Sequence, residues 1–136
     1  MQENTLHILI IDDDEINNFI AVKLINKIAL PTMVSACLNG REGLDLIKSR
    51  IENKEPLPDV IFLDINMPIM NGWEFLEEFI LMKDQLDKDI AINMLSSSVY
   101  NDDISKAKSY PVVKSFISKP LSLDKIKDIL EGFEKS

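Results

Sequence analysis

The sequence is poor in the residues from which proteins build zinc sites and disulfides. Its 136 residues include one cysteine and one histidine. Cys37 therefore has no partner for an internal disulfide, and together with His7 it supplies too few ligands for a tetrahedral zinc site. We interpret Cys37 as a small packing residue near the end of a strand, and His7 as a structural residue within one.

A membrane span and a surplus of positive charge are also missing. No apolar run approaches the roughly 20 residues that a transmembrane helix needs, and the N-terminal residues lack the basic start of a secretory signal peptide. The formal net charge is -8 and the pI is about 4.6, whereas proteins that grip nucleic-acid phosphates present a basic face. We therefore expect a cytoplasmic protein that binds neither a membrane nor nucleic acid directly.

The overall amino-acid composition is that of a folded globular protein. Hydrophobic residues make up 46% of the sequence and charged residues 28%, a balance that is typical of ordinary globular domains. A chain of this length buries a core of its own and is too short for two. We expect one domain over residues 1–136, with its core between about residues 6 and 133.

Short apolar runs alternate along the chain with segments of helical spacing. The runs predict strands over residues 6–11, 32–37, 60–63, 90–95 and 112–117. The first helix should bury a face made of Phe19, Ile20, Val22, Leu24, Ile25 and Ile28. Further helices are expected around residues 44–51, over 73–86 and 102–110, and after a cap at Ser122.

Five successive strand–helix units predict an α/β fold with helices on both faces of a parallel sheet, because crossovers between parallel strands are right-handed. The expected architecture is a flavodoxin-like, doubly wound (βα)5 fold with strand order 2-1-3-4-5. In that order the first and third strands flank the point where the strand order reverses, and ligands of such sheets bind outside the carboxyl ends of the strands.

Polar side chains stand where four of the expected strands end. Asp12 and Asp13 follow the first strand, Asp64 the third, Ser96 the fourth and Lys119 the fifth. The predicted strand order brings the acidic pair beside Asp64, and like charges held together need a cation for compensation. An oxygen-only set with few protein ligands suits Mg²⁺ better than a softer metal.

With these residues in place, the chain resembles the receiver domain of two-component response regulators, in a stand-alone form. The string from Leu63 to Gly72 is similar to the phosphoacceptor loop of that family. The acidic pair after the first strand, Ser96, and the Lys119-Pro120 pair match further family positions in the same order. The resemblance extends from Leu6 to about Phe133.

The resemblance implies a Mg²⁺-dependent transfer of a phosphoryl group to Asp64 from a sensor histidine kinase or a histidine phosphotransfer protein. It implies that Asp13, Asp64 and the backbone carbonyl of Asn66 bind Mg²⁺ directly, with Asp12 acting through water. Lys119 would hold the carboxylate before the transfer and the phosphoryl group after it. Such a domain is not an enzyme toward other molecules, because it catalyses only its own phosphorylation and dephosphorylation.

The resemblance also implies how the signal leaves the site. Ser96 would donate a hydrogen bond to the phosphoryl group, and Phe116 would act as an aromatic switch. The output surface would be the face formed by the fourth helix, fifth strand and fifth helix, which binds a downstream protein. The side chain at Ser98 would influence the lifetime of the phosphoryl group.

Other interpretations remain open at this point. An Asp-x-Asp after the first strand also occurs in haloacid-dehalogenase-type phosphatases, where Asp12 would be the nucleophile; a binding module of the same fold that signals without phosphorylation is another alternative. Asp14 is interpreted as a helix cap. Ser97 could replace Ser96 after a one-residue shift, and Phe116 could be plain core. The charge runs at 77–78 and 87–89 are interpreted as solvated surface.

Overall fold

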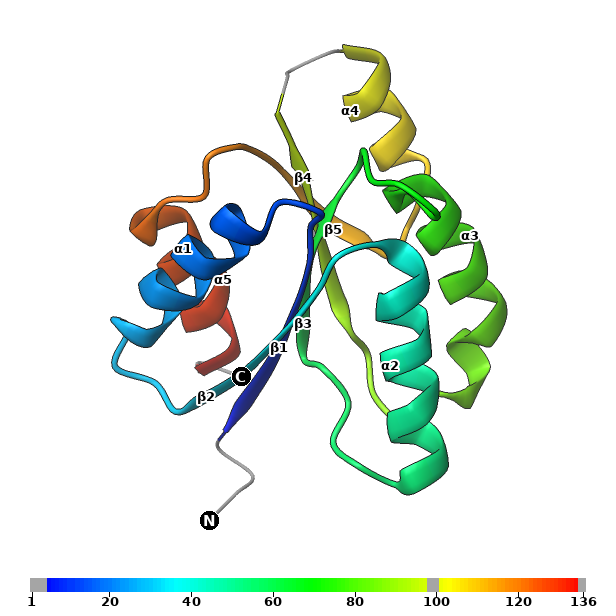
Figure 1. Ribbon diagram of the computed structural model, residues 1–136, viewed down its shortest axis with the longest axis horizontal. Coiled ribbons are helices and arrows are strands. Elements are labelled where there is room, and N and C mark those ends of the chain that lie inside the picture. Colours follow the sequence, from blue (N-terminus) through cyan, green and yellow to red (C-terminus); the bar gives the residue numbers. More distant parts are fainter. Residues whose placement is uncertain (1–4, 98–100, 135–136) are drawn as a thin grey trace.

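The computed structural model describes residues 5–97 and 101–134, and its centre is a five-stranded parallel sheet (Figure 1). The strand order is β2-β1-β3-β4-β5, which confirms the predicted fold class. The strands are β1 (Leu6–Ile11), β2 (Thr32–Cys37), β3 (Val60–Asp64), β4 (Ala91–Ser96) and β5 (Val113–Ser118).

Helices cover both faces of the sheet. They are α1 (Glu15–Asn26), α2 (Gly40–Asn53), α3 (Gly72–Met82), α4 (Asn101–Lys108) and α5 (Leu123–Glu134), and the 3-10 turn η2 (Lys83–Gln85) extends α3. Figure 1 shows α1 and α5 side by side on one face, with α2 and α3 on the other and α4 beyond the end of α3. Within the described residues, no helix is long and apolar enough to span a membrane.

The helices begin where short polar side chains replace the missing backbone partners. The Asp14 carboxylate accepts hydrogen bonds from the amides of Ile16 and Asn17 at the start of α1. Asn71 and Glu74 form a reciprocal capping box at α3. A cap of this kind is worth about 1 kcal/mol to a helix. The interpretation of Asp14 as a cap agrees with these bonds.

The core lies in two layers, one on each face of the sheet. Side chains such as Leu63 and Phe75 pack between the sheet and α2 and α3, while Ile25 and Leu130 pack between the sheet and α1 and α5. Every residue of β3 is buried. Each such aliphatic or aromatic side chain contributes roughly 1.5–3 kcal/mol when it leaves water, so β3 and its charged last residue are held in place by both layers.

The register of the strands brings their carboxyl ends to one edge. Ile11 is paired with Leu63, and Asp64 with Leu95. Ser96 is paired with Ser118, the residue before Lys119. All four polar positions predicted at strand ends therefore lie at this edge: Asp64 and Ser96 end β3 and β4, while the acidic pair and Lys119 follow directly after β1 and β5.

Several details of the sequence prediction are wrong. Phe19 and Ile20 are 62% and 48% exposed, so they do not belong to the buried face of α1. At 3.6 residues per turn that face runs instead through Asn18, Ala21 and Ile25. The third helix ends at Met82 rather than at Leu86, and the fourth at Lys108 rather than at Tyr110. Asp64 and Ser96 are the last residues of β3 and β4 rather than the first residues after them.

Candidate functional site

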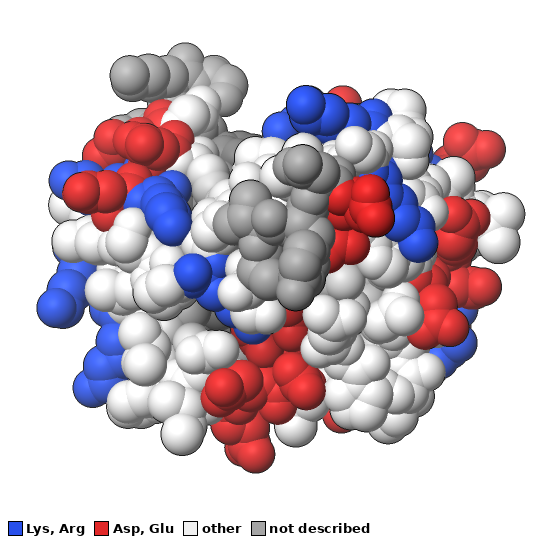
Figure 2. Space-filling model, turned by 90° about the horizontal axis from the view of Figure 1, so that it is seen from above, with Lys and Arg blue, Asp and Glu red and all other residues white. Residues whose placement is uncertain are grey.

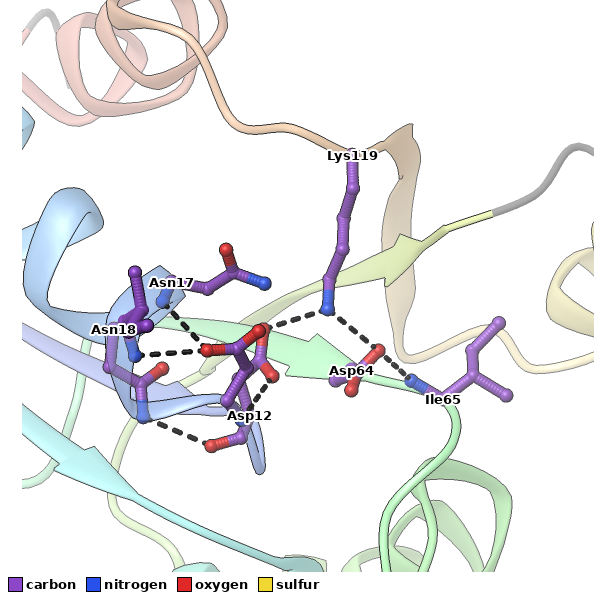
Figure 3. Close-up of polar contacts among 8 residues, drawn as sticks. Asp12, Asn17, Asn18, Asp64, Ile65 and Lys119 are labelled. Carbon is purple, nitrogen blue, oxygen red and sulfur yellow. Dashed lines mark hydrogen bonds and ion pairs between the residues drawn. The ribbon is translucent and has the colours of Figure 1, made fainter.

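Two carboxylates and an ammonium group meet at the carboxyl edge of the sheet (Figure 3). The Nζ atom of Lys119 lies 2.8 Å from Asp12 Oδ2 and 3.3 Å from Asp64 Oδ1. All three side chains are largely withdrawn from water, with exposed fractions of 16% for Lys119, 2% for Asp12 and 8% for Asp64. Lys119, which follows the carboxyl end of β5, thus links the residues at the carboxyl ends of β1 and β3.

Asp12 is held by hydrogen bonds with the β1–α1 turn, with α1 and β2, and with Lys119. Its Oδ1 accepts a hydrogen bond from the Asp14 amide at 2.9 Å, and its Oδ2 accepts the bond from Lys119. Its backbone carbonyl accepts a bond of 3.0 Å from the side-chain amide of Asn18. The backbone amide of Asp12 donates to Cys37 on β2. Both carboxylate oxygens of Asp12 are therefore engaged within the protein.

Asp64 is the last residue of β3, and its surroundings disfavour the charged form of its carboxyl group. Burial, and after it the negative charge of Asp12, raise the pKa of Asp64 from 3.8 to about 6, against the opposing effect of Lys119. Its Oδ1 also accepts a hydrogen bond of 2.9 Å from the amide of Ile65. The carboxylate is thus anchored in position and short of compensating positive charge.

Lys119 is fixed by its backbone as well as by its side chain. Its amide donates a hydrogen bond of 2.7 Å to the carbonyl of Ser96, and a cis peptide bond joins it to Pro120. Burial on its own lowers the pKa of Lys119, but the hydrogen bond to Asp12 and the charges of Asp64 and Asp12 outweigh it and raise the pKa. The ammonium group therefore stays charged and offsets part of the negative charge of Asp12 and Asp64.

Asp13 completes a possible metal site. Oxygen atoms of Asp12, Asp13 and Asp64 lie within 4.8 Å of one another, and Asp13 is exposed while the other two are buried. Carboxylate oxygens are the ligands that hard divalent cations prefer, and an exposed position leaves room for water in the coordination sphere. The donor set therefore fits Mg²⁺. Figure 2, which looks down on this edge, shows acidic side chains gathered in a patch there.

Hydrogen bonds and a close backbone contact hold the loop after β3 next to Asp64. The Gly72 amide donates to the Ile65 carbonyl at 2.8 Å, and a Cβ atom at Gly72 would lie 2.5 Å from the carbonyl oxygen of Asp64. Only glycine permits this close approach. Ile69 adopts a φ of 68° as the Met70 amide bonds to the Pro68 carbonyl, a γ-turn. Asn66 lies exposed in this loop, next to the acidic cluster in sequence.

The other predicted site residues lie at or near the same edge. Ser96 is 3% exposed at the end of β4, where its carbonyl accepts the Lys119 amide. Phe116 lies on β5, paired with Met94, and is half-buried against the core on the α2 and α3 side. Ser98, for which we predict an influence on phosphoryl lifetime, lies outside the described residues.

Sequence reasoning missed two sets of polar contacts. Asn18 is 6% exposed on the buried face of α1, and its Oδ1 has no hydrogen-bond partner within the described residues. A polar residue in register with Ala21 and Ile25 is the signal that could have revealed it. The charge runs at 77–78 and 87–89 have exposed carboxylates, as expected, but sequence reasoning did not foresee that Lys88 pairs with Asp59 at 2.9 Å or that Glu77 accepts a hydrogen bond from Tyr110.

Comparisons with known proteins place this geometry in a family. Residues 8–131 match the response regulator receiver domain. The chain is 23% identical over 133 residues to the probable methanogenesis regulatory protein FilR2 of Methanothrix harundinacea, covering 98% of this chain and 84% of that protein. It is 28% identical over 128 residues to the probable C4-dicarboxylate response regulator DctR of Bacillus subtilis, covering 94% of this chain and 52% of that protein.

A solved structure of a response regulator has a similar fold. A two-component response regulator from Cytophaga hutchinsonii superposes with a TM-score of 0.85 and 26% identity, over 96% of this chain and 97% of that chain. The fold and the acidic edge define a receiver-type α/β domain, and the chain belongs to the response regulator receiver family. The resemblance stated from the sequence is confirmed. The chain spans about half the length of the B. subtilis regulator.

Proposed function

We propose that Asp64 accepts a phosphoryl group in a Mg²⁺-dependent reaction, and that the phosphorylated protein signals through a changed protein-binding surface. The observation that carries the proposal is the position of Lys119 Nζ, 2.8 Å from Asp12 and 3.3 Å from Asp64. A buried carboxylate at the end of a strand, with a lysine beside it and two further acids for a cation, is suited to phosphoryl transfer. In such transfers the protein mainly positions groups and balances charge.

The reaction joins an Asp64 oxygen to phosphorus while the bond between phosphorus and the donor breaks. The donor is a phosphohistidine of a sensor histidine kinase or histidine phosphotransfer protein, or a small acyl phosphate. The leaving imidazole nitrogen or carboxylate oxygen keeps the electron pair of the broken bond. Lys119 already lies against Asp64 and can stay with the added negative charge after the transfer.

The acidic residues would contact the cation in two ways, directly and through water. Both Asp12 oxygens are engaged, by Asp14 and by Lys119, which supports a contact through water rather than direct coordination. Asp13, Asp64 and the backbone carbonyl of Asn66 are then the direct ligands. When bound, Mg²⁺ supplies positive charge next to the transferring phosphoryl group.

The signal would leave along β4 and β5. Ser96 donates a hydrogen bond to the phosphoryl group, which draws in the chain that leads to α4. Phe116 turns inward as that chain moves, and the face of α4, β5 and α5 then presents a different surface to a downstream protein. The chemistry of the chain itself ends with its own phosphorylation and dephosphorylation.

Intact-protein mass spectrometry after incubation with acetyl phosphate tests the proposal. We expect a gain of one phosphoryl group that needs Mg²⁺ and is absent in Asp64→Asn. Asp59→Asn is the matched control, since it removes a carboxylate from the opposite edge of the sheet, and it should be phosphorylated like the wild type. Absence of any gain would favour a phosphorylation-independent binding module. Hydrolysis without retained phosphate, kept in Asp64→Asn and lost in Asp12→Asn, would favour the phosphatase alternative.

A further inference from the structure

A cluster of four side chains joins α3 to the carboxyl end of α4. The ring of Trp73 stacks on the ring of Tyr110, with centroids 6.0 Å apart and planes inclined by 22°. The Nζ atom of Lys106 lies 4.7 Å from the centre of the Trp73 ring. The Tyr110 hydroxyl donates a hydrogen bond of 2.5 Å to Glu77. We call these four residues the α3–α4 clamp.

One half of the clamp is fixed to the phosphoacceptor site. Trp73 follows Gly72, whose amide bonds to the Ile65 carbonyl and where an added Cβ atom would lie 2.5 Å from the carbonyl oxygen of Asp64. The helix that carries Trp73 and Glu77 buries Phe75, among other side chains, in the core. This half cannot shift without disturbing both the core and the loop around Asp64.

The other half is attached more weakly. Of the described side chains of α4, Ala107 alone is buried. Figure 1 shows α4 at the end of the molecule, beyond the main body of the sheet. Tyr110 lies in the turn between α4 and β5, where its amide bonds to the Ala107 carbonyl and its carbonyl accepts the Val113 amide. The clamp therefore links α4 and the turn after it to α3 in addition to the burial of Ala107 in the core.

The clamp is formed in the conformation in which Lys119 contacts the Asp64 carboxylate itself. The helix α4 begins at Asn101, five residues after Ser96, so a change at Ser96 is passed to α4 over a short stretch of chain. Any contact that favours one position of α4 must oppose a ligand that favours another, by the same free energy.

We propose that the α3–α4 clamp stabilises the position of α4 that belongs to unphosphorylated Asp64, and that it opens when the site carries a phosphoryl group. This inference rests on the proposed function, because it takes Asp64 as the phosphoacceptor. It assigns to Trp73, Lys106, Tyr110 and Glu77 a regulatory role: they set how readily the site accepts its ligand.

The test uses beryllofluoride with Mg²⁺ as a stable phosphoryl analogue on the full chain. Its dissociation constant is measured by fluorine NMR for the wild type, Lys106→Met, Tyr110→Leu and Lys108→Met. Lys108→Met is the matched control, since it removes an exposed lysine of α4 that takes no part in the clamp. We expect about threefold tighter binding in both clamp variants, the size expected from losing an exposed cation–π or stacking contact, and no change in the control.

Trp73 also reports on the clamp directly, because it is the only tryptophan of the chain. Its fluorescence emission should change when beryllofluoride and Mg²⁺ are added to the wild type, and should not change in Asp64→Asn. Equal or weaker analogue binding by both clamp variants overturns the clamp proposal, as does analogue uptake with unchanged Trp73 emission. A wild type that takes up no beryllofluoride overturns the proposed function itself, and the clamp proposal with it.

Discussion

The two edges of the sheet each hold a lysine beside a carboxylate, and they differ in how the charge is balanced. At the amino edge, Lys88 Nζ lies 2.9 Å from Asp59, with exposed fractions of 34% and 22%. The same ammonium group bonds to the Leu57 carbonyl, and the His7 backbone amide donates to the other Asp59 oxygen. One positive and one negative charge meet there, and both side chains are partly exposed to water.

At the carboxyl edge, one ammonium group serves several acids. Lys119 contacts both Asp12 and Asp64, and Asp13 lies within reach of both carboxylates. The sum of these charges is negative, and most of it is buried. The difference lies in the balance of charge: at the amino edge one ammonium group offsets one carboxylate, whereas at the carboxyl edge negative charge is in excess and an added cation would offset it.

The largest difference between the two edges should come from removing each lysine. Lys119→Met leaves buried carboxylates without their ammonium partner, which costs about 3 kcal/mol of the free energy of unfolding, as for other broken buried pairs. Urea unfolding at pH 8 without divalent cations measures it. Part of the loss should be recovered at pH 5, where Asp64 takes up a proton. A loss that is the same at both pH values would show that protonation of Asp64 does not relieve the removal of Lys119.

The second effect concerns Asp64 and pH. The unfolded carboxyl titrates near its ordinary pKa of 3.8 and the folded one at about 6. The folded protein therefore binds more protons between these values, so stability falls as the pH rises through this window and is level above it. A difference of two pKa units corresponds to roughly 3 kcal/mol, and this net difference already includes the attraction of Lys119. We therefore expect Asp64→Asn to stabilise the folded protein at neutral pH by about 2–3 kcal/mol.

Urea unfolding of Asp64→Asn and wild type at several pH values between 4 and 8 checks this prediction. The fall in stability across the window should disappear in the variant, while Asp59→Asn, at the other edge, should keep it. A fall of the same size in Asp64→Asn would assign the titration to another group.

A smaller effect should come from Mg²⁺. An ion that binds the folded protein at about ten times its Kd adds roughly 1.4 kcal/mol, or about 5 °C in Tm for a domain of this size. Differential scanning calorimetry with and without Mg²⁺ measures the shift. The shift should vanish in Asp13→Asn and persist in Asp59→Asn, so an equal shift in both variants would place the ion elsewhere.

The smallest effect is expected at the amino edge. Lys88→Met should destabilise by at most about 1 kcal/mol, because a half-exposed ion pair gains little over its separate, hydrated charges. Thermal unfolding at low and at moderate salt measures both the size and the screening of the pair. A loss as large as that of Lys119→Met would remove the contrast between the two edges.

The sequence predicted the fold class and brought the main charged residues to one edge, because both follow from local patterns. Apolar runs identify buried strands, and polar residues after each run identify where Asp64 and Lys119 stand. The face of α1 was predicted less well. Phe19 and Ile20 are apolar and lie on the outside, and the polar Asn18 is inside, because composition does not fix how far a helix is rotated about its axis.

The contacts between distant segments could not be read in the same way. Asp12 and Lys119 are more than a hundred residues apart in sequence, yet their charged atoms are separated by 2.8 Å. A strand order can predict that they share an edge, but not that one ammonium group lies between Asp12 and Asp64. That arrangement depends on strand register and on the hydrogen bond that fixes Lys119 to Ser96.

By itself, then, the amino-acid sequence determined which residues end the strands and what chemistry they carry, since strand formation and side-chain type are local properties. Only the tertiary structure decided which of them touch: the sharing of Lys119, the outward face of α1, the pairing of Lys88 with Asp59, and the stacking of Trp73 on Tyr110. Those contacts join residues from different elements, and their geometry is set by how the two core layers pack against the sheet.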